Sequence, residues 1–206
     1  MEKQSVMVVI TSDDEVKTMP YEDYRSQQKA VEGSIEHFGS STISIPFGGN
    51  LKVDFWCNEE FRYSEAESCK KVNPLGSALY SGILDKGEAT FTEQGLIFGN
   101  VAITVALPEG ETRGFENIID DEGEQDICET WFVEDILLRI KNGLEREGIS
   151  QSLHEGYDNK TVEPEVQVMS FDDPEEFLNA MQSMGKADVK TDKNVSQKKS
   201  GTEHND

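Results

Sequence analysis

The sequence lacks long apolar segments and has few basic residues. Apolar residues make up 35% of the 206-residue chain. No stretch approaches the about 18 consecutive apolar residues that a membrane-spanning helix needs, and the apolar run over 6–10 is too short for a signal peptide. Only 19 side chains are basic and 41 are acidic, which gives a formal net charge of −22. We expect no direct binding to nucleic acid or to membranes, because both would repel so negative a chain.

Cysteine is scarce, and paired metal-binding motifs are absent. The three cysteines, Cys57, Cys69 and Cys128, are an odd number at unrelated spacings. That pattern favours reduced, buried thiols in a bacterial cytoplasm over a disulfide framework. The sequence contains no Cys-x-x-Cys pair and no His-x-x-x-His pair, so we expect neither a structural zinc site nor another cofactor.

One acidic run has part of the pattern of a calcium-binding loop. With Asp120 at position one, Glu122 and Glu124 occupy positions three and five. Position six is Gln125 instead of glycine, and position twelve is Trp131 instead of glutamate, so an EF-hand is excluded. The glycine-rich segments lack the spacing of phosphate-binding loops. We therefore expect no metal site, no catalytic residues and no enzyme activity.

Hydrophobic periodicity over 1–108 predicts an α+β domain. Apolar residues at steps of three and four predict a helix over 21–32, and Asn73 and Pro74 predict the N-cap and first residue of a second helix. β-branched runs, alternating patterns and one long apolar run predict strands over 5–10, 34–38, 42–45, 51–55 and, at the centre of the sheet, 96–105. We expect a mostly antiparallel sheet with the two helices covering one face.

The remaining chain differs in charge and pattern. Residues 109–185 carry 21 acidic and 5 basic side chains, a net charge of −16, whereas residues 1–108 carry −7 and residues 186–206 carry +1. Helical periodicity over 131–147 predicts an amphipathic helix that ends at Gly148. Its predicted apolar stripe consists of Phe132 or Val133, Ile136, Leu137, Ile140 and Leu144.

The domain organisation follows from these patterns. We predict an α+β domain over 1–108, an acidic segment with the amphipathic helix over 109–148, a linker and a short helix over 149–185, and a disordered tail over 186–206. Within the third part, residues 149–169 are expected to be irregular. The helix that follows begins at Asp173 and Pro174.

The helix ending near Met184 has two possible roles. Phe177, Leu178 and Met181 can dock on the sheet, or they can bind as helical anchors in the groove of a partner. We favour docking, because isolated helices of this length are marginally stable.

Four short motifs within residues 20–105 resemble those of a known family. They are Ala30-Val31-Glu32-Gly33-Ser34-Ile35-Glu36, Cys57-Asn58-Glu59-Glu60, Asn73-Pro74-Leu75-Gly76-Ser77-Ala78-Leu79 and Phe98-Gly99-Asn100-Val101-Ala102-Ile103. The family consists of small domains of unknown function encoded mainly by phages and plasmids of Gram-positive bacteria. The resemblance implies a mobile-element origin. It supplies no catalytic residues, because the family has no established chemistry.

The concentration of charge leads to the functional hypothesis. Carboxylates on one face can occupy a basic groove that normally binds phosphates. We expect a cytoplasmic inhibitor that mimics nucleic acid and binds a bacterial defence nuclease, either a restriction enzyme or a CRISPR effector. The candidate partner-binding residues are Glu116, Asp120, Asp121, Glu122, Glu124, Asp126, Glu129, Glu134, Asp135, Asp172, Asp173, Glu175 and Glu176. The alternative is a module that recognises a host protein by shape and apolar contacts, with acidity serving only solubility.

Overall fold

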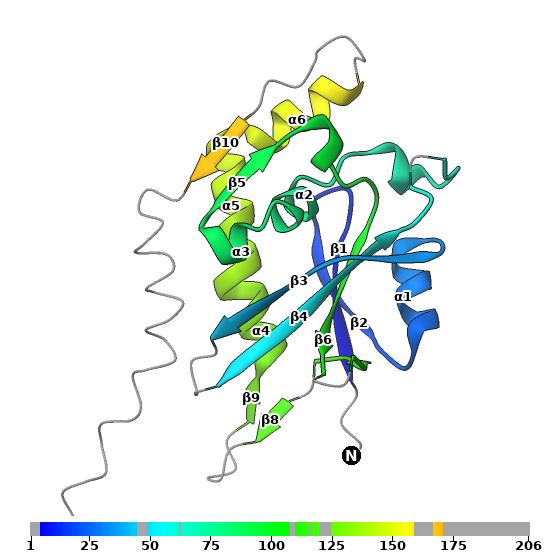
Figure 1. The fold of residues 1–206 in the computed structure, drawn as a ribbon, viewed down its shortest axis with the longest axis vertical. Coiled ribbons are helices and arrows are strands. Elements are labelled where there is room, and N and C mark those ends of the chain that lie inside the picture. Colours follow the sequence, from blue (N-terminus) through cyan, green and yellow to red (C-terminus); the bar gives the residue numbers. More distant parts are fainter. Residues whose placement is uncertain are drawn as a thin grey trace, which may run out of the picture.

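The fold is known from a computed structural model (Figure 1). It describes residues 5–44, 49–61, 63–107, 110–115, 117–119, 125–158 and 167–170. For residues 117–119, 125–129, 157–158 and 167–170 it describes the backbone alone. The predicted helix after Asp173 and the predicted disordered tail lie outside the described residues.

A six-stranded antiparallel sheet forms the centre of the fold. Its main strands lie in the order β2-β1-β6-β4-β3, and the short strand β7 (Thr112–Arg113) pairs with β6. The five main strands are β1 (Val6–Ile10), β2 (Val16–Pro20), β3 (Ile35–Ser44), β4 (Asn50–Asn58) and β6 (Val101–Ala106). The predicted α+β class is confirmed. The strand predicted over 96–105 lies at the centre of the sheet as β6, but it begins at Val101, so the prediction is wrong for residues 96–100.

Both faces of the sheet are buried, which explains the uninterrupted apolar run of β1. Val8 and Ile10 point into the larger hydrophobic cluster, whereas Met7 and Val9 point to the other face and pack against helix α1 (Tyr24–Val31). Because side chains alternate along a strand, a strand buried on both faces needs apolar residues at every position.

The two predicted helices of the N-terminal part lie on opposite faces of the sheet. Helix α1 packs on one face, and α2 (Pro74–Tyr80) and α3 (Ile83–Lys86) pack on the other, as Figure 1 shows. The prediction that both helices cover one face is therefore wrong. An open second face would leave Met7 and Val9 exposed to water, although both are fully buried.

The predicted amphipathic helix is present and belongs to the same core as the sheet. It consists of α4 (Cys128–Trp131), a π-helical segment η3 (Phe132–Leu137) and α5 (Leu138–Arg146). The predicted stripe is at most 1% exposed at Phe132, Ile136, Leu137, Ile140 and Leu144. These side chains join the cluster that contains Val8 and Ile103, so one hydrophobic core extends across the predicted boundary at residue 108.

Residues 149–169 contain a helix and a strand that the sequence analysis does not predict. Gly148, with φ of +70°, ends α5 as expected, and α6 (Ile149–Asp158) follows at once. Strand β10 (Gln167–Ser170) pairs with β5 (Glu88–Phe91). The prediction of irregular structure is therefore wrong for both segments. In α6, a few apolar residues, including Ile149 and Leu153, are enough to dock the helix on the core.

Three boundaries in the N-terminal half also differ from the prediction. Pro20 ends strand β2, at an edge of the sheet where a missing N–H is tolerated. Helix α1 therefore starts later, at Tyr24, and the Asp23 side chain caps it by accepting a hydrogen bond of 2.8 Å from the Arg25 N–H. The two strands expected over 34–38 and 42–45 form one strand, β3, with a β-bulge after His37.

Four further elements complete the described fold. The 3-10 helices η1 (Glu67–Lys70) and η2 (Glu93–Gly95) lie in loops, and strands β8 (Asn117–Ile119) and β9 (Gln125–Ile127) form a separate antiparallel hairpin. In the part of the chain that the structure describes, no helix has both the length and the apolar character needed to cross a lipid bilayer.

Candidate partner-binding surfaces

The structure describes the side chains of only two residues of the predicted acidic site. Glu134 is exposed and Asp135 is partly exposed, both on the outer side of the amphipathic helix. The backbones of Asp126 and Glu129 are described in β9 and α4. The other predicted site residues lie outside the described residues: Glu116, Asp120, Asp121, Glu122, Glu124, Asp172, Asp173, Glu175 and Glu176.

The outer side of the amphipathic helix carries charges of both signs. Its residues 131–147 contain four acidic and three basic side chains. The ion pairs there include Asp135–Arg139 at 3.8 Å, Lys141–Glu145 at 3.3 Å and Arg146–Glu147 at 3.8 Å. This part of the predicted site is therefore not an uninterrupted row of carboxylates.

A denser group of carboxylates lies where β1, α1 and β4 end. We define this acidic loop surface by eight exposed residues, which are Asp13, Glu15, Glu32, Glu36, Glu59, Glu60, Glu65 and Glu67. The loops that carry them are joined by hydrogen bonds, such as the one of 2.9 Å from the Glu59 N–H to the Ser34 carbonyl. None of the eight belongs to the predicted site, since their segments are far apart in the sequence.

Among the described residues of these loops, few basic groups accompany the carboxylates. In the described part of the loops, Lys70 pairs with Glu67 and Lys71 pairs with Asp13, each at 2.5 Å. The Lys70 hydrogen bond and positive charge lower the pKa of the Glu67 carboxyl, so Glu67 stays ionised at neutral pH. The acidic loop surface is therefore strongly negative.

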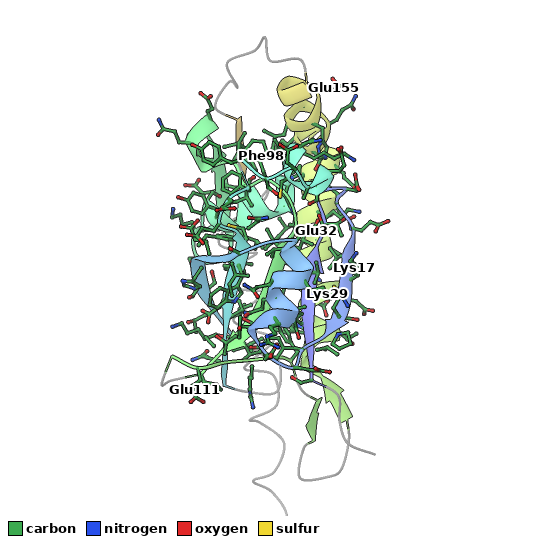
Figure 2. The ribbon with its side chains drawn as sticks, turned by 90° about the vertical axis from the view of Figure 1, so that its right-hand side faces the viewer. Lys17, Lys29, Glu32, Phe98, Glu111 and Glu155 are labelled. Carbon is green, nitrogen blue, oxygen red and sulfur yellow. The ribbon has the colours of Figure 1, made fainter. Side chains whose placement is uncertain are left out.

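Glu32 is held in place on this surface. It follows α1 in the left-handed conformation, with φ of +59°, which is uncommon for a residue with a side chain. Its Oε2 accepts a hydrogen bond of 2.5 Å from the Ser68 hydroxyl. Figure 2 shows Glu32 at the end of α1, well away from Glu111 near one end of the long axis.

Three buried asparagines hold the loops together. Asn58 Nδ2 donates to the Glu32 carbonyl at 3.2 Å, and Asn58 Oδ1 accepts from the Glu60 N–H at 2.9 Å. Asn100 accepts from the Ser12 N–H at 3.1 Å and donates to the Ala30 carbonyl at 3.0 Å. Asn73 likewise forms hydrogen bonds with backbone groups of Ile10, Gly76 and Gly99. All three asparagines lie in the motifs that carry the family resemblance. We therefore interpret these motif residues as positioning residues.

A second polar group lies on the sheet face that α1 only partly covers. Ser40 Oγ donates a hydrogen bond of 2.6 Å to Asp54 Oδ1, and His37 Nε2 lies 3.1 Å from Ser40 Oγ and 3.4 Å from Asp54 Oδ1. We call His37, Ser40 and Asp54 the bulge cluster. The sequence analysis does not predict it.

The bulge cluster is not arranged for nucleophilic catalysis. In a catalytic triad the serine hydroxyl donates to histidine, and the carboxylate accepts from the other ring nitrogen. Here the hydroxyl hydrogen goes to Asp54, because a carboxylate can only accept, and His37 Nε2 faces both partners. This geometry orients the three side chains relative to one another and does not activate Ser40.

Cys57 and Cys69 are buried free thiols, as predicted. Burial, with smaller contributions from Glu36 and Cys69, raises the pKa of Cys57 to about 12. Because the thiolate is the reactive form, we expect iodoacetamide at pH 8 to leave Cys57 unmodified in the native protein and to alkylate it in urea. Mass spectrometry of the Cys57 peptide measures this. Rapid labelling of the native protein would contradict the described burial.

No group of three or more potential metal-ligating side chains occurs among the residues that the structure describes.

The comparisons with known proteins assign no family to the chain. No family model, no curated protein and no solved structure matches the chain. The resemblance to phage- and plasmid-encoded domains therefore stays a prediction.

Proposed function

We propose that the chain is a non-catalytic acidic protein that acts in the bacterial cytoplasm by occupying the nucleic-acid-binding surface of a basic protein. The proposed partner is a defence nuclease, either a restriction enzyme or a CRISPR effector. The acidic loop surface carries this proposal, because it presents eight exposed carboxylates on loops that hydrogen bonds hold in place.

The physical basis is competition for lysine and arginine side chains. Double-stranded DNA presents about one negative charge per 1.7 Å of its axis, and proteins bind it through basic groups directed at phosphates. Positioned carboxylates can bind the same groups and attract them over a distance, and added salt weakens this attraction. The acids of 109–129 and 172–176 remain part of the proposed surface, in addition to the loops.

The test is inhibition of purified nucleases. Representative restriction enzymes and CRISPR effectors are assayed for DNA cleavage with increasing amounts of the full chain. We expect stoichiometric inhibition of at least one enzyme, relieved by raising the concentration of cleavable substrate DNA and weakened by added NaCl. Inhibition that excess substrate DNA does not relieve would contradict the mimic.

A matched pair of variants separates local charge from total charge. Glu59→Gln/Glu60→Gln/Glu65→Gln removes three carboxylates from the acidic loop surface, and we expect it to weaken inhibition about tenfold. The control variant changes the net charge equally at exposed positions elsewhere, namely Glu22, Glu88 and Glu111, and is expected to change inhibition little. Equal losses in both variants would indicate that only total charge matters.

One observation favours the alternative, recognition of a host protein by shape and apolar contact. Tyr63 lies in the sequence between Glu60 and Glu65 of the acidic loop surface and is 87% exposed. Exposed tyrosines are frequent binding hot spots. If Tyr63→Ala abolishes binding while Glu59→Gln/Glu60→Gln/Glu65→Gln does not, apolar recognition is the better account.

A further inference from the structure

The bulge cluster exists because of one irregularity in β3. Side chains of a regular strand alternate between faces, so residues 37 and 40 would lie on opposite faces. His37 pairs with Trp56 and Gly39 pairs with Phe55, which leaves Phe38 as the extra residue. The shift brings Ser40 opposite Asp54, on the same face as His37. Bulges often serve to redirect side chains toward a site.

The two carboxylate oxygens of Asp54 differ in their contacts with other side chains. Oδ1 lies within reach of both Ser40 and His37, at 2.6 and 3.4 Å. Oδ2 accepts no hydrogen bond from the described residues and is not fully enclosed by them. The Asp54 side chain is 13% exposed, so water reaches it only in part. A carboxylate in this position interacts more strongly with a cation than a fully exposed one does.

Two aromatic rings lie beside this carboxylate. The centroids of His37 and Trp56 are 5.0 Å apart, and the ring planes are tilted by 58°. Trp56 is held in orientation by a hydrogen bond of 2.8 Å from its Nε1 to Thr104 Oγ1. A planar guanidinium can stack on such rings while it donates to a carboxylate, which an ammonium group does less well.

From this arrangement we propose that the bulge cluster and Trp56 form a recognition site for the guanidinium group of an arginine side chain. The arginine belongs to the basic partner, so the inference rests on the proposed function. Lys52 lies two residues before Asp54 on the same face and is exposed, and in the described part of the chain it is not within 4.0 Å of that carboxylate. The Asp54 carboxylate therefore has room for an external cation, which Lys52 opposes by repulsion.

The experiment titrates the full ¹⁵N-labelled chain with the peptide acetyl-Gly-Arg-Gly-amide and with its uncharged citrulline counterpart. We expect the arginine peptide to shift the Trp56 indole N–H signal and leave that of Trp131, which is buried in the core, unchanged. The citrulline peptide should cause no shift. Equal shifts with both peptides, or arginine-induced shifts confined to the acidic loop surface, would overturn the proposal.

Three variants sharpen the result. Asp54→Asn keeps the side-chain shape and should weaken arginine binding about fivefold, as expected for loss of one ion pair. Lys52→Gln alters only an exposed side chain and should strengthen binding, and Glu88→Gln, an exposed position in β5 on the other side of the sheet, should leave it unchanged. Unaltered binding in Asp54→Asn overturns the inference.

The nuclease assays separate this inference from the function on which it rests. If DNA-relieved inhibition persists while Asp54→Asn leaves peptide binding unaltered, only the arginine site is wrong. If no nuclease is inhibited while the peptide responses are as expected, the site stands and the proposed function is wrong.

Discussion

Replacing Phe132 with alanine is expected to lower the free energy of unfolding by about 3–5 kcal/mol, the usual cost of removing a buried aromatic side chain. Phe132 is fully buried. Its ring stacks on that of Phe115, with centroids 5.6 Å apart and planes tilted by 23°. Phe115 in turn exchanges backbone hydrogen bonds with Val6 at the start of β1. Urea unfolding followed by circular dichroism measures the change.

The control is a neighbouring exposed position. Glu134→Ala lies in the same helix and should change stability by no more than about 0.5 kcal/mol. Because the helix belongs to the same core as the sheet, circular dichroism and tryptophan fluorescence should report one unfolding transition in the wild-type chain. Two separate transitions, or a small effect of Phe132→Ala, would indicate that the helix forms a unit of its own.

The sequence predicts those parts of the fold whose hydrophobic pattern is local. The stripe from Phe132 to Leu144 and the N-cap at Asn73 are confirmed because a helix shows its periodicity within a few turns. Helix α6 is missed because only a few apolar residues dock it on the core, and this depends on a surface made by distant segments. The single strand β3 is read as two because its bulge interrupts the alternation that predicts strands.

The candidate surfaces are less predictable, for a similar reason. Net charge by segment directs attention to residues 109–185, but the eight carboxylates of the acidic loop surface come together only when β1, α1 and β4 end at neighbouring loops. Without the bulge, the regular alternation of side chains along β3 would place His37 and Ser40 on opposite faces of the sheet. The sequence contains no local signal for Asn58 or Asn100 either, since their partners lie up to 88 residues away.

Asn73→Ala is expected to destabilise the protein by about 3 kcal/mol, because one side chain serves three backbone groups. Oδ1 caps α2 by accepting from the Gly76 N–H at 2.8 Å. Nδ2 donates to the Ile10 carbonyl at 3.2 Å and to the Gly99 carbonyl at 2.9 Å. Alanine leaves all three groups buried without these partners. Urea unfolding measures the loss, and an effect below about 1 kcal/mol would mean that water replaces the amide.

Asn73→Asp tests which of these bonds matters more. An aspartate keeps the cap but places a carboxylate, fully buried, against the Ile10 and Gly99 carbonyl oxygens. Both burial and the facing oxygens raise its pKa above the unfolded value of about 3.9. A raised pKa means that the protonated form fits the folded state, so the variant should lie closest to wild type at low pH. Its deficit in unfolding free energy should grow as pH rises from about 4 toward 7. A variant as stable as wild type at every pH would show that the cap alone determines the role of Asn73, and that the bonds from Nδ2 contribute little.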